Sequence, residues 1–457
     1  MNPEFERNIW LEITPRRVLL MVGLLALIFF AASVTTGGDS ALFATVQGTA
    51  TLLYYLIVVV WGSRSAALSV VGEIRDRTWD GQRLSSLGAG TMTWGKLFGA
   101  TIYNWFGGAI CLALLLINVG SNLGPLTAAI ELLYYVAIGV IAQAAALLAS
   151  LVAIGRRQGH SRFEIFLYQM VGLVAAVAVY WVWSAADPVA ALMTHKPAVD
   201  FIAWWGLSLD ARGFLLASVA IFAGWTLVGC YREMRLELKM RNGPLVWLGF
   251  VLFMGFYVAG FDAWLSQDVK GWDPVALRLL LAGTTFAVLT YLMVLLEPKD
   301  RVHYRWMQGQ FFQGHVINAL RGLQAWMTSY IATFAAAGAL SLWLLRDPSA
   351  AAVGQPLVLA AMGFLTRDVA LFVLMNALPG KRRGDFAALA ILFALYVLAP
   401  AILSGLQLKG LLLVFFPQLP APPWIGVTAA WLEGLVVVGL ALGRIALGTR
   451  DAKPAAA

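Results

Sequence analysis

The chain has 457 residues, of which 60% are hydrophobic and 12% are charged. This composition excludes a sizeable soluble domain, because the connections between the long apolar runs span roughly thirty residues at most. The formal net charge of +8 does not indicate a nucleic-acid partner either. The basic residues lie mainly at the ends of apolar runs, where we expect membrane lipids to be their partners.

Twelve apolar runs each have the ~20 residues that a helix needs to cross the hydrocarbon core. They predict an all-α, polytopic integral membrane protein with about twelve transmembrane helices. The predicted spans are residues 17–36, 41–63, 94–118, 126–155, 163–186, 212–231, 244–265, 276–297, 316–346, 354–379, 385–407 and 424–447. Most of the 32 Lys and Arg residues lie in one set of alternate connections, which also contains both termini. Because basic residues favour the cytoplasmic side, both termini are predicted to be cytoplasmic.

Residues 1–16 precede the first span and predict an interfacial amphipathic helix that lies on the membrane. Its apolar face is formed by Phe5, Ile9, Trp10 and Ile13. Its other face carries Glu4, Glu6, Arg7 and Glu12. The helix is expected to end near Thr14-Pro15, because a proline marks a helix boundary.

The loop after the second span, residues 73–99, has the most organised polar pattern in the chain. Its apolar positions are Ile74, Trp79, Leu84 and Leu87. Its charged and polar positions are Arg75, Asp76, Arg77, Asp80, Gln82 and Arg83. Together they predict a short amphipathic helix with its charged side toward the cytosol, which suits docking into a groove on a soluble partner. An interfacial linker helix with snorkelling arginines explains the same pattern, and these residues alone leave both interpretations open.

The same loop resembles the cytoplasmic coupling region of ABC-2 type permeases, the transmembrane subunits of ABC exporters. The family pattern is an acidic–basic cluster, Gly-Thr or Thr-Trp, an acidic residue, a Leu pair, a small polar turn and a Gly-Lys that opens the third span. The matching positions are Glu73, Arg75, Thr78, Trp79, Asp80, Leu84, Gly95 and Lys96. Asn2-Pro3-Glu4 and the amphipathic segment after it also resemble that family's elbow helix. The proline that commonly follows the Leu pair is absent, with Gly88-Ala89-Gly90 in its place.

The resemblance implies a permease of an ATP-driven exporter in a bacterial cytoplasmic (inner) membrane, with an amphipathic or lipid-like substrate. ATP would bind to a separate, soluble ABC ATPase, because the chain has no GxxxxGK[ST] phosphate loop. We expect no cofactor, metal or catalytic residue on this chain, which would not itself be an enzyme. Two ATPase copies would dock, one on residues 73–90 and one on residues 298–312. The expected coupling residues are Glu73, Arg75, Asp76, Arg77, Thr78, Trp79, Asp80, Leu84, Lys96, Asp300 and Arg301.

Basic clusters recur at an offset of about 225 residues and predict a tandem duplication. The matches are Arg75-Asp76-Arg77 with Lys299-Asp300-Arg301, Lys96 with Arg321, and Arg156-Arg157 with Lys381-Arg382. The predicted halves are residues 1–240, with the elbow helix and the coupling loop 64–93, and residues 241–457, with a degenerate coupling loop 298–315. Six spans in each half would make the repeat parallel. The alternative is that any twelve-span protein has basic loops at regular spacing.

Arg367 and Asp368 are predicted near the middle of the tenth span, where a charge costs at least ~2.5–3.5 kcal/mol. Adjacent helical residues point about 100° apart, so we expect each to find a partner on another helix. Asp262 in the seventh span and Glu433 in the twelfth are the candidate partners of Arg367. The group either lines a transport pathway or forms a buried ion pair that holds the second half together.

Two other classes of protein compete with the exporter permease. An ion-coupled secondary transporter needs a carboxylate at mid-membrane, and Asp368 is a candidate, but such a carrier gives no role to the ordered loop 73–96. A membrane-embedded glycosyltransferase would place catalytic carboxylates on a substantial outer loop. Asp187, Asp200 and Asp210 are instead spread over one connection without visible pairing. The exporter permease is therefore the favoured interpretation.

Overall fold

The computed structural model describes residues 2–34, 39–155, 162–185, 199–264, 273–378, 384–415 and 423–447. Within these ranges, eleven helices are long and apolar enough to cross a membrane, and the strands form one two-stranded sheet. The prediction of an all-α polytopic membrane protein is confirmed. The seventh predicted span contains only a 15-residue apolar helix, so the described residues hold eleven full-length spans and one shorter helix.

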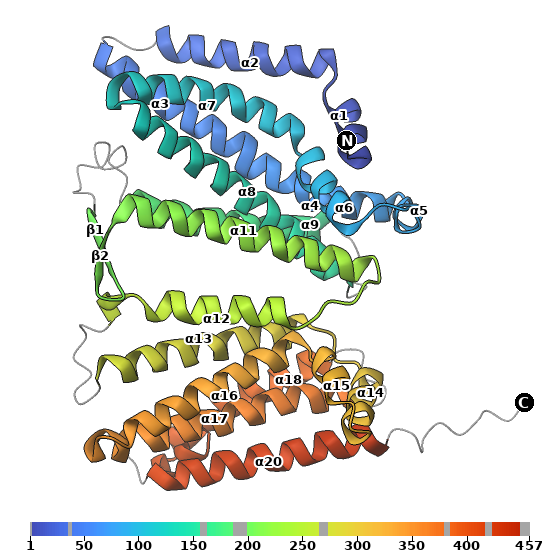
Figure 1. Cartoon of the computed structure of the whole chain (residues 1–457), viewed down its shortest axis with the longest axis vertical. Helices are drawn as coiled ribbons and strands as arrows, with labels where there is room; N and C mark the ends of the chain where they lie inside the picture. The colour runs from blue at the N-terminus through green and yellow to red at the C-terminus, as the bar shows by residue number, and fades with distance from the viewer. Residues whose placement is uncertain are drawn as a thin grey trace, which may run out of the picture. The chain divides into compact units, whose positions relative to one another are not determined.

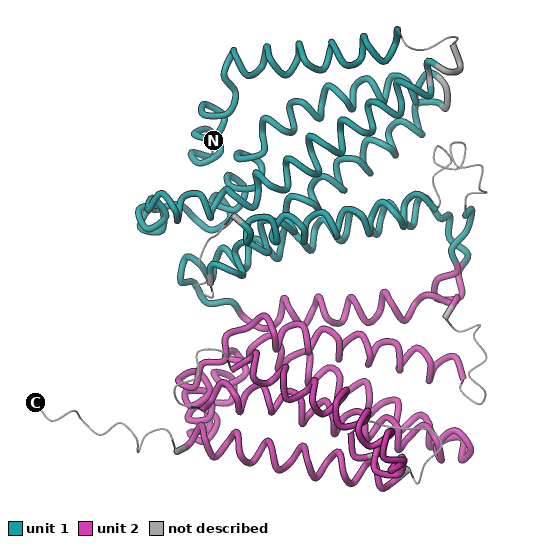
Figure 2. Tube along the Cα trace, turned by 180° about the vertical axis from the view of Figure 1, so that it is seen from behind, with its two compact units in different colours: residues 1–202, 208–242 teal, residues 203–207, 243–457 magenta. Residues whose placement is uncertain are grey.

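The chain divides into two compact units, coloured separately in Figure 2. Unit 1 comprises residues 1–202 and 208–242, and unit 2 comprises residues 203–207 and 243–457. The main division thus falls two residues from the predicted boundary at 240/241. Arg156, Arg157, Lys381 and Arg382, which form one match of the predicted duplication, lie outside the described residues, as does Asp187. The duplication therefore stays a prediction.

Unit 1 is a bundle around α8, a 31-residue helix that packs against α4, α7, α9 and α11. Its helices (Figure 1) are α1 (Pro3–Glu12), α2 (Pro15–Val34), α3 (Asp39–Tyr54), η1 (Tyr55–Trp61), α4 (Gly62–Arg75), α5 (Trp79–Arg83), α6 (Ala89–Trp94), η2 (Gly95–Gly99), α7 (Ile102–Leu123), α8 (Pro125–Gly155), α9 (Arg162–Ser184) and α11 (Ala211–Glu237). The strands β1 (Phe201–Trp204) and β2 (Leu207–Asp210) form a hairpin before α11, of which residues 203–207 belong to unit 2.

The N-terminal helix α1 is present, and two of its polar residues pack against the rest of unit 1. Asn2 Oδ1 accepts two backbone N–H groups of the first turn, which caps the helix. Its buried residues are Glu4 and Asn8, whereas Trp10 is 83% exposed. Glu4, which the sequence pattern assigned to the charged face, thus faces the rest of unit 1. The membrane-surface location of α1 stays a prediction.

The second span is longer than the predicted 41–63. α3, η1 and α4 are continuous, and the apolar span within them covers Ala44–Arg75, or 32 residues. Helix α4 continues because Ala66, Ala67 and Val70 keep a fully buried face beyond the predicted end. A helix of this length is about 48 Å long, whereas the hydrocarbon core is ~30 Å thick. The continuous helix is therefore roughly 18 Å longer than the hydrocarbon core is thick.

Unit 2 has a similar plan around α17, a 30-residue helix that packs against α13, α16, α18 and α20. Its helices are α12 (Leu245–Ala259), η3 (Asp262–Trp264), α13 (Pro274–Leu296), α14 (Arg301–Phe312), α15 (Val316–Arg321), α16 (Ala325–Leu344), α17 (Pro348–Ala377), α18 (Gly384–Phe393), η4 (Ala394–Leu398), α19 (Ala399–Gly405), η5 (Lys409–Val414) and α20 (Pro423–Leu447). Figure 1 shows α14 and α15 together at one end of this unit.

The predicted ninth span, 316–346, is two helices rather than one. α15 ends at Arg321 and α16 begins at Ala325. The Glu297 carboxylate accepts the backbone N–H groups of Ala325 and Trp326, both at 3.0 Å. These bonds satisfy N–H groups that lack a partner within the helix, so α16 starts here. The sequence pattern missed the break because the capping residue comes from the preceding span.

Candidate functional site

α5 is the short helix in the loop that the sequence pattern selected for coupling. α4 ends at Arg75, and the chain reverses through Arg77, whose φ of 59° is left-handed. The backbone N–H and the Oγ1 of Thr78 both donate to the carbonyl oxygen of Glu73, at 2.9 and 3.2 Å. These bonds fold α5 back against the end of α4, at one end of unit 1 (Figure 1).

One side of α5 is buried and the other is exposed. Trp79 is 3% exposed and belongs to the same buried cluster as Val70 of α4. The side chains of Asp80 and Leu84 are each 88% exposed. Leu84 does not lie on the apolar side of the short helix, as its sequence pattern predicted, because α5 ends at Arg83 and Leu84 lies beyond it. Its coupling role stays a prediction. The remaining predicted coupling residues of this turn are also exposed: Arg75, Asp76, Arg77 and Thr78.

Arg83 attaches α5 to the last helix of unit 1. Its Nε and Nη2 donate to the carbonyl oxygen of Glu237 at 3.0 and 2.9 Å, and Nη2 lies 3.1 Å from Glu237 Oε2. Glu237 is the last residue of α11, where the free carbonyl groups carry partial negative charge. No sequence pattern links the two residues, because they are far apart in the chain.

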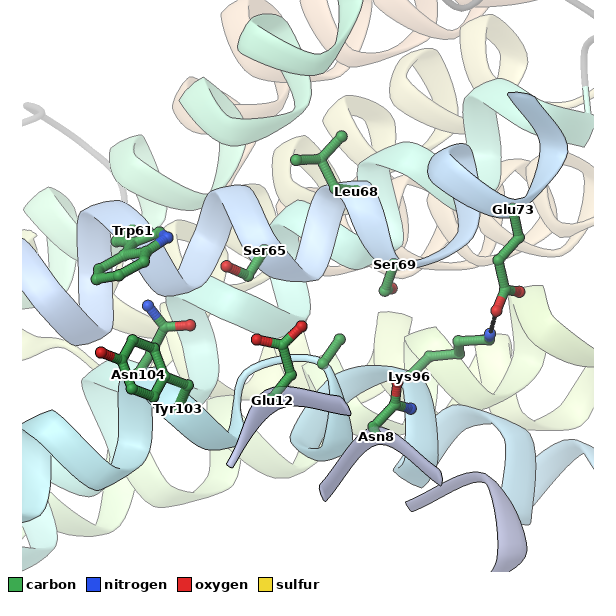
Figure 3. Close-up of a pocket in the computed structure, with 11 residues that line it drawn as sticks. Asn8, Glu12, Trp61, Ser65, Leu68, Ser69, Glu73, Lys96, Tyr103 and Asn104 are labelled. Carbon is green, nitrogen blue, oxygen red and sulfur yellow. Dashed lines mark ion pairs between the residues drawn. The ribbon is translucent and has the colours of Figure 1, made fainter. Parts of the chain in front are cut away.

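Four charged residues, which we call the junction cluster, connect three helical segments. They are Glu4 and Arg7 of α1, Glu73 of α4 and Lys96 of η2. Lys96 Nζ lies 2.7 Å from Glu4 Oε1 and also forms an ion pair with Glu73, which Figure 3 shows. Arg7 Nη2 lies 2.8 Å from Glu4 Oε1 and 2.7 Å from Glu73 Oε1. Two cations and two anions balance, so each buried charge has a partner of opposite sign.

The burial of Lys96 corrects its predicted role at a coupling surface. Its side chain is 1% exposed, so it cannot contact a docked protein directly. The residue before Lys96 must be small, because a Cβ at Gly95 would overlap the Glu4 side chain. The Gly-Lys pair therefore holds α1 against η2. The sequence could not indicate this, since the partner of Lys96 lies on the N-terminal helix.

A cavity of about 290 Å³ lies beside the junction cluster, between α1, α4 and α7 (Figure 3). Its polar lining includes Asn8, Glu12, Ser65, Ser69 and Asn104. Trp61 and Tyr103 add an edge-to-face aromatic pair with ring centroids 5.6 Å apart. A polar space of this size can hold water molecules. Asp80 and Leu84 do not line it, so it is distinct from the exposed side of α5.

The π-helical turn η1 is fixed by three side-chain amides from three other helices. Asn104 Nδ2 of α7 donates to Ile57 O (3.1 Å), Gln143 Nε2 of α8 to Val58 O (3.0 Å), and Gln169 Nε2 of α9 to Val60 O (2.9 Å). Gln143 Oε1 also accepts from Trp105 Nε1 at 2.9 Å. π-helical turns often occur at functional sites. Here the turn separates the apolar part of the second span from the part that leads to α5.

In unit 2 two adjacent buried charges, Arg367 and Asp368, lie within α17, in a group that we call the Arg367 cluster. Arg367 Nη1 lies 2.7 Å from Glu433 Oε2, and its Nε lies 3.0 Å from Asp368 Oδ1. The hydroxyls of Tyr291 and Tyr396 donate to Asp368 Oδ2 at 2.8 and 2.7 Å. The side chains of Arg367 and Asp368 are 3% and 1% exposed, and that of Glu433 is 30% exposed.

Two expectations about this cluster are corrected. Arg367 contacts Glu433 but not Asp262, which lies in η3 after α12 has ended. Asp262 instead pairs with Arg278 Nη2 at 2.6 Å and accepts the N–H of Gly206 at 2.7 Å. Arg367 and Asp368 do pair, although they are adjacent, because the long arginine side chain can fold back to its neighbour.

α14 follows the second span of unit 2, as α5 follows that of unit 1. Asp300 caps α14 by accepting a backbone N–H of its first turn at 2.9 Å. Tyr304 is buried, and its hydroxyl donates to Gln324 Oε1 at 3.0 Å. Arg305 Nε donates to the carbonyl oxygen of Ile445, near the end of α20, at 2.7 Å. Each unit thus attaches its loop to the end of its own last helix through an arginine.

No protein-family model, curated protein or solved structure matches this chain. Among the residues that the structure describes, no group of three or more His, Cys, Asp or Glu residues could hold a metal ion. The function is therefore inferred from the contacts of the chain's own residues.

Proposed function

We propose that the chain is the transmembrane subunit of an ATP-driven exporter of the ABC-2 type, in a bacterial cytoplasmic membrane with both termini in the cytoplasm. The arrangement of α5 is the observation that supports this best. Trp79 and Arg83 hold the helix from one side, while Asp80 and Leu84 stay exposed. An exposed side on a firmly held helix suits a docking partner, whereas a linker between two spans has no need of it.

The anchors of α5 offer a path for force from a docked ATPase into unit 1. Trp79 packs with residues of α4, and Arg83 contacts the end of α11. Gln82 Nε2 donates to Glu73 Oε1 at 2.6 Å, which adds a bond to the junction cluster. Movement of α5 would therefore displace several helices together, as in rigid-body transitions between two access states.

In this proposal the ATP is bound and hydrolysed by a separate soluble ABC ATPase, of which two copies dock. One copy binds α5 within residues 73–90. The other binds the start of α14 within residues 298–312, where Asp300 and Arg301 lie. The permease itself performs no chemistry, and its substrate is amphipathic or lipid-like, as the family resemblance implies.

Reversing the charge of Asp80 tests the docking model. In Asp80→Lys, association with a co-expressed ABC ATPase and transport should both fall to background. Expression and thermal stability in detergent should not change, because Asp80 is exposed and its nearest cation, Arg83, lies at 3.5 Å. Asp200→Lys, at another exposed carboxylate outside both loops, is the matched control. Normal stimulation of ATP hydrolysis by Asp80→Lys would contradict the model.

The Arg367 cluster favours a second candidate, an ion-coupled secondary transporter. Asp368 is almost fully buried and accepts hydrogen bonds from two tyrosines, as a coupling carboxylate could. Such a protein would take up substrate into proteoliposomes under an imposed pH gradient without any ATPase. Uptake of this kind that is lost in Asp368→Asn would replace the exporter proposal. Uptake that requires both ATP and a co-reconstituted ATPase would retain it.

A further inference from the structure

The loop of unit 2 has an apolar tip that none of the described residues of unit 2 covers. We define the tip as residues 311–321. Phe312 is 85% exposed, Ile317 67%, Phe311 61% and Leu320 52%. In the loop of unit 1, which the structure describes throughout residues 75–90, Leu84 is the exposed large hydrophobic residue. The two loops therefore present different surfaces.

The tip is a folded element. α14 ends at Phe312, and the chain turns through Gly314, whose φ is 80°. The N–H of His315 then donates to the carbonyl oxygen of Gln310 at 2.9 Å. Asn318 Nδ2 of α15 donates to Gln310 Oε1 at 3.2 Å, which holds α15 against the end of α14. The exposed apolar side chains thus belong to one compact turn of two helices.

The charges around the tip have a single sign. Residues 301–324 contain three arginines and two histidines but neither Asp nor Glu. Within the tip, His315 and Arg321 are exposed. The loop of unit 1 instead mixes both signs, with Asp76 and Asp80 beside Arg77 and Arg83. Exposed aromatic and aliphatic side chains combined with positive charge alone are typical of elements that bind anionic membrane surfaces.

The position of the tip in the chain keeps it close to the ends of membrane spans. α13 ends at Leu296 and α16 begins at Ala325, so only short segments separate the two loop helices from the spans. The Tyr304–Gln324 and Arg305–Ile445 hydrogen bonds attach α14 to residues at the ends of α16 and α20. A bilayer around these spans would have its surface within reach of the tip.

We propose that the tip binds the anionic lipid surface of the leaflet next to α14. Phe312 and Ile317 insert at the level of the headgroups, and His315 and Arg321 face the lipid phosphates. This role is separate from ATPase docking at α5 and does not depend on it. It also leaves the start of α14, with Asp300 and Arg301, free for a protein partner.

The depth of single labelled cysteines tests the proposal on the full-length chain. Phe312→Cys carries a bimane label, and Leu84→Cys, whose native side chain is exposed to a similar degree, is the matched control. The native Cys111 and Cys230 are buried and should label little. The proteins are placed in vesicles of phosphatidylglycerol and phosphatidylcholine in equal parts, without any ATPase. Quenching is measured with nitroxide-labelled lipid and with aqueous iodide.

The expected result is opposite quenching at the two positions. Nitroxide lipid should quench the label at residue 312 several-fold more than the label at residue 84, and iodide should show the reverse order. Ile317→Cys is a second reporter if Phe312→Cys does not fold. Equal access of iodide to both positions would overturn the proposal. Protection of residue 312 only after an ATPase is added would also overturn it, because the tip would then bind protein.

The charge of the tip is tested separately. Arg321→Glu should reduce lipid quenching at residue 312 in vesicles with phosphatidylglycerol and have little effect in phosphatidylcholine alone. The same quenching in both lipids, with and without Arg321→Glu, would show that anionic lipid is not recognised. Neither measurement involves ATP, so the proposed exporter function can fail while this proposal stands, and the reverse also holds.

Discussion

The two units bury charge in different places. In unit 1 the buried cation is Lys96, at the end of the unit that holds α5, where it joins α1, α4 and η2. The middle of α8, the central helix of this unit, carries the neutral Gln143. In unit 2 the central helix α17 carries Arg367. Unit 2 thus buries charge inside a span, where an unpaired charge is most costly, whereas the middle of α8 in unit 1 is neutral.

The ion pairs at the loop-bearing ends of the two units differ in how far their carboxylates are buried. At the α14 end, Lys299 pairs with Asp385 at 2.7 Å, and the Asp385 side chain is 38% exposed. At the α5 end, Lys96 has two carboxylate partners that are 4% and 16% exposed. The carboxylate partner of Lys299 is partly solvated, whereas both carboxylate partners of Lys96 are largely buried, so water screens the Lys96 ion pairs less. We therefore expect the end of unit 1 to be the stiffer one.

The largest expected effect follows from removing the cation of the junction cluster. Lys96→Met should lower stability by about 3–5 kcal/mol, because Glu4 and Glu73 would keep buried charge with less compensation. Lys299→Met is the matched change in unit 2 and should cost less, because the Asp385 carboxylate that it leaves behind is 38% exposed and can be hydrated. Thermal unfolding in detergent measures both. Equal losses would mean that the two ends are held equally, and the comparison would fail.

The second-largest loss of stability is expected from changes in the Arg367 cluster. Arg367→Leu should lower the unfolding temperature strongly, because Asp368 would keep a buried charge with only tyrosine partners. Combining it with Glu433→Gln should cost less than the sum of the two single changes, since the residues are in contact. Asp262→Asn should add its own effect in full, because Asp262 pairs with Arg278. If the effects of Arg367→Leu and Asp262→Asn on the unfolding temperature were not additive, the result would contradict the observed contacts.

Gln143→Leu tests the neutral residue in the middle of α8, the central helix of unit 1, and should lower stability less than Arg367→Leu does. It leaves Val58 O and Trp105 Nε1 without their side-chain partner, which costs about 1–3 kcal/mol. Gln143→Glu should be worse than Gln143→Leu, because it introduces an unpaired charge where unit 1 has none. If Gln143→Glu were as stable as the wild-type chain in the same unfolding assay, the middle of α8 would tolerate charge as α17 does.

The smallest expected effect concerns the start of α13 in unit 2. Asp273 Oδ1 caps α13 by accepting the Ala276 N–H at 2.8 Å, and Trp343 Nε1 donates to its other oxygen. Asp273→Ala should cost about 1 kcal/mol. Burial would raise the pKa of Asp273, but these hydrogen bonds lower it below its usual value. Its contribution is therefore complete above pH 4 or so and is lost as the pH falls through the folded-state pKa. Unfolding of wild type and Asp273→Ala at pH 7 and at low pH should show the difference disappearing in acid.

The membrane fold could be predicted from the sequence because long apolar runs have few other uses. Helix ends were harder to predict, because α4 continues on a buried face and α16 starts where Glu297 caps it. Glu433 was found as a partner of Arg367 because carboxylates inside spans are rare. The burial of Lys96 could not be predicted, because Glu4 comes from a distant helix and no local pattern records that contact.

The length of α4 has a mechanical consequence. Its 14 residues form a rod of about 21 Å between the turn η1 and the loop that carries α5. Helices often kink at π-helical turns, so η1 is a place where this rod can bend. Because the rod is about 21 Å long, a tilt of about 10° at η1 would move its far end by about 4 Å. The side-chain amides of Asn104, Gln143 and Gln169 oppose this bending. The stronger they hold η1, the more a force applied at α5 would move the spans beyond η1 rather than bend the turn.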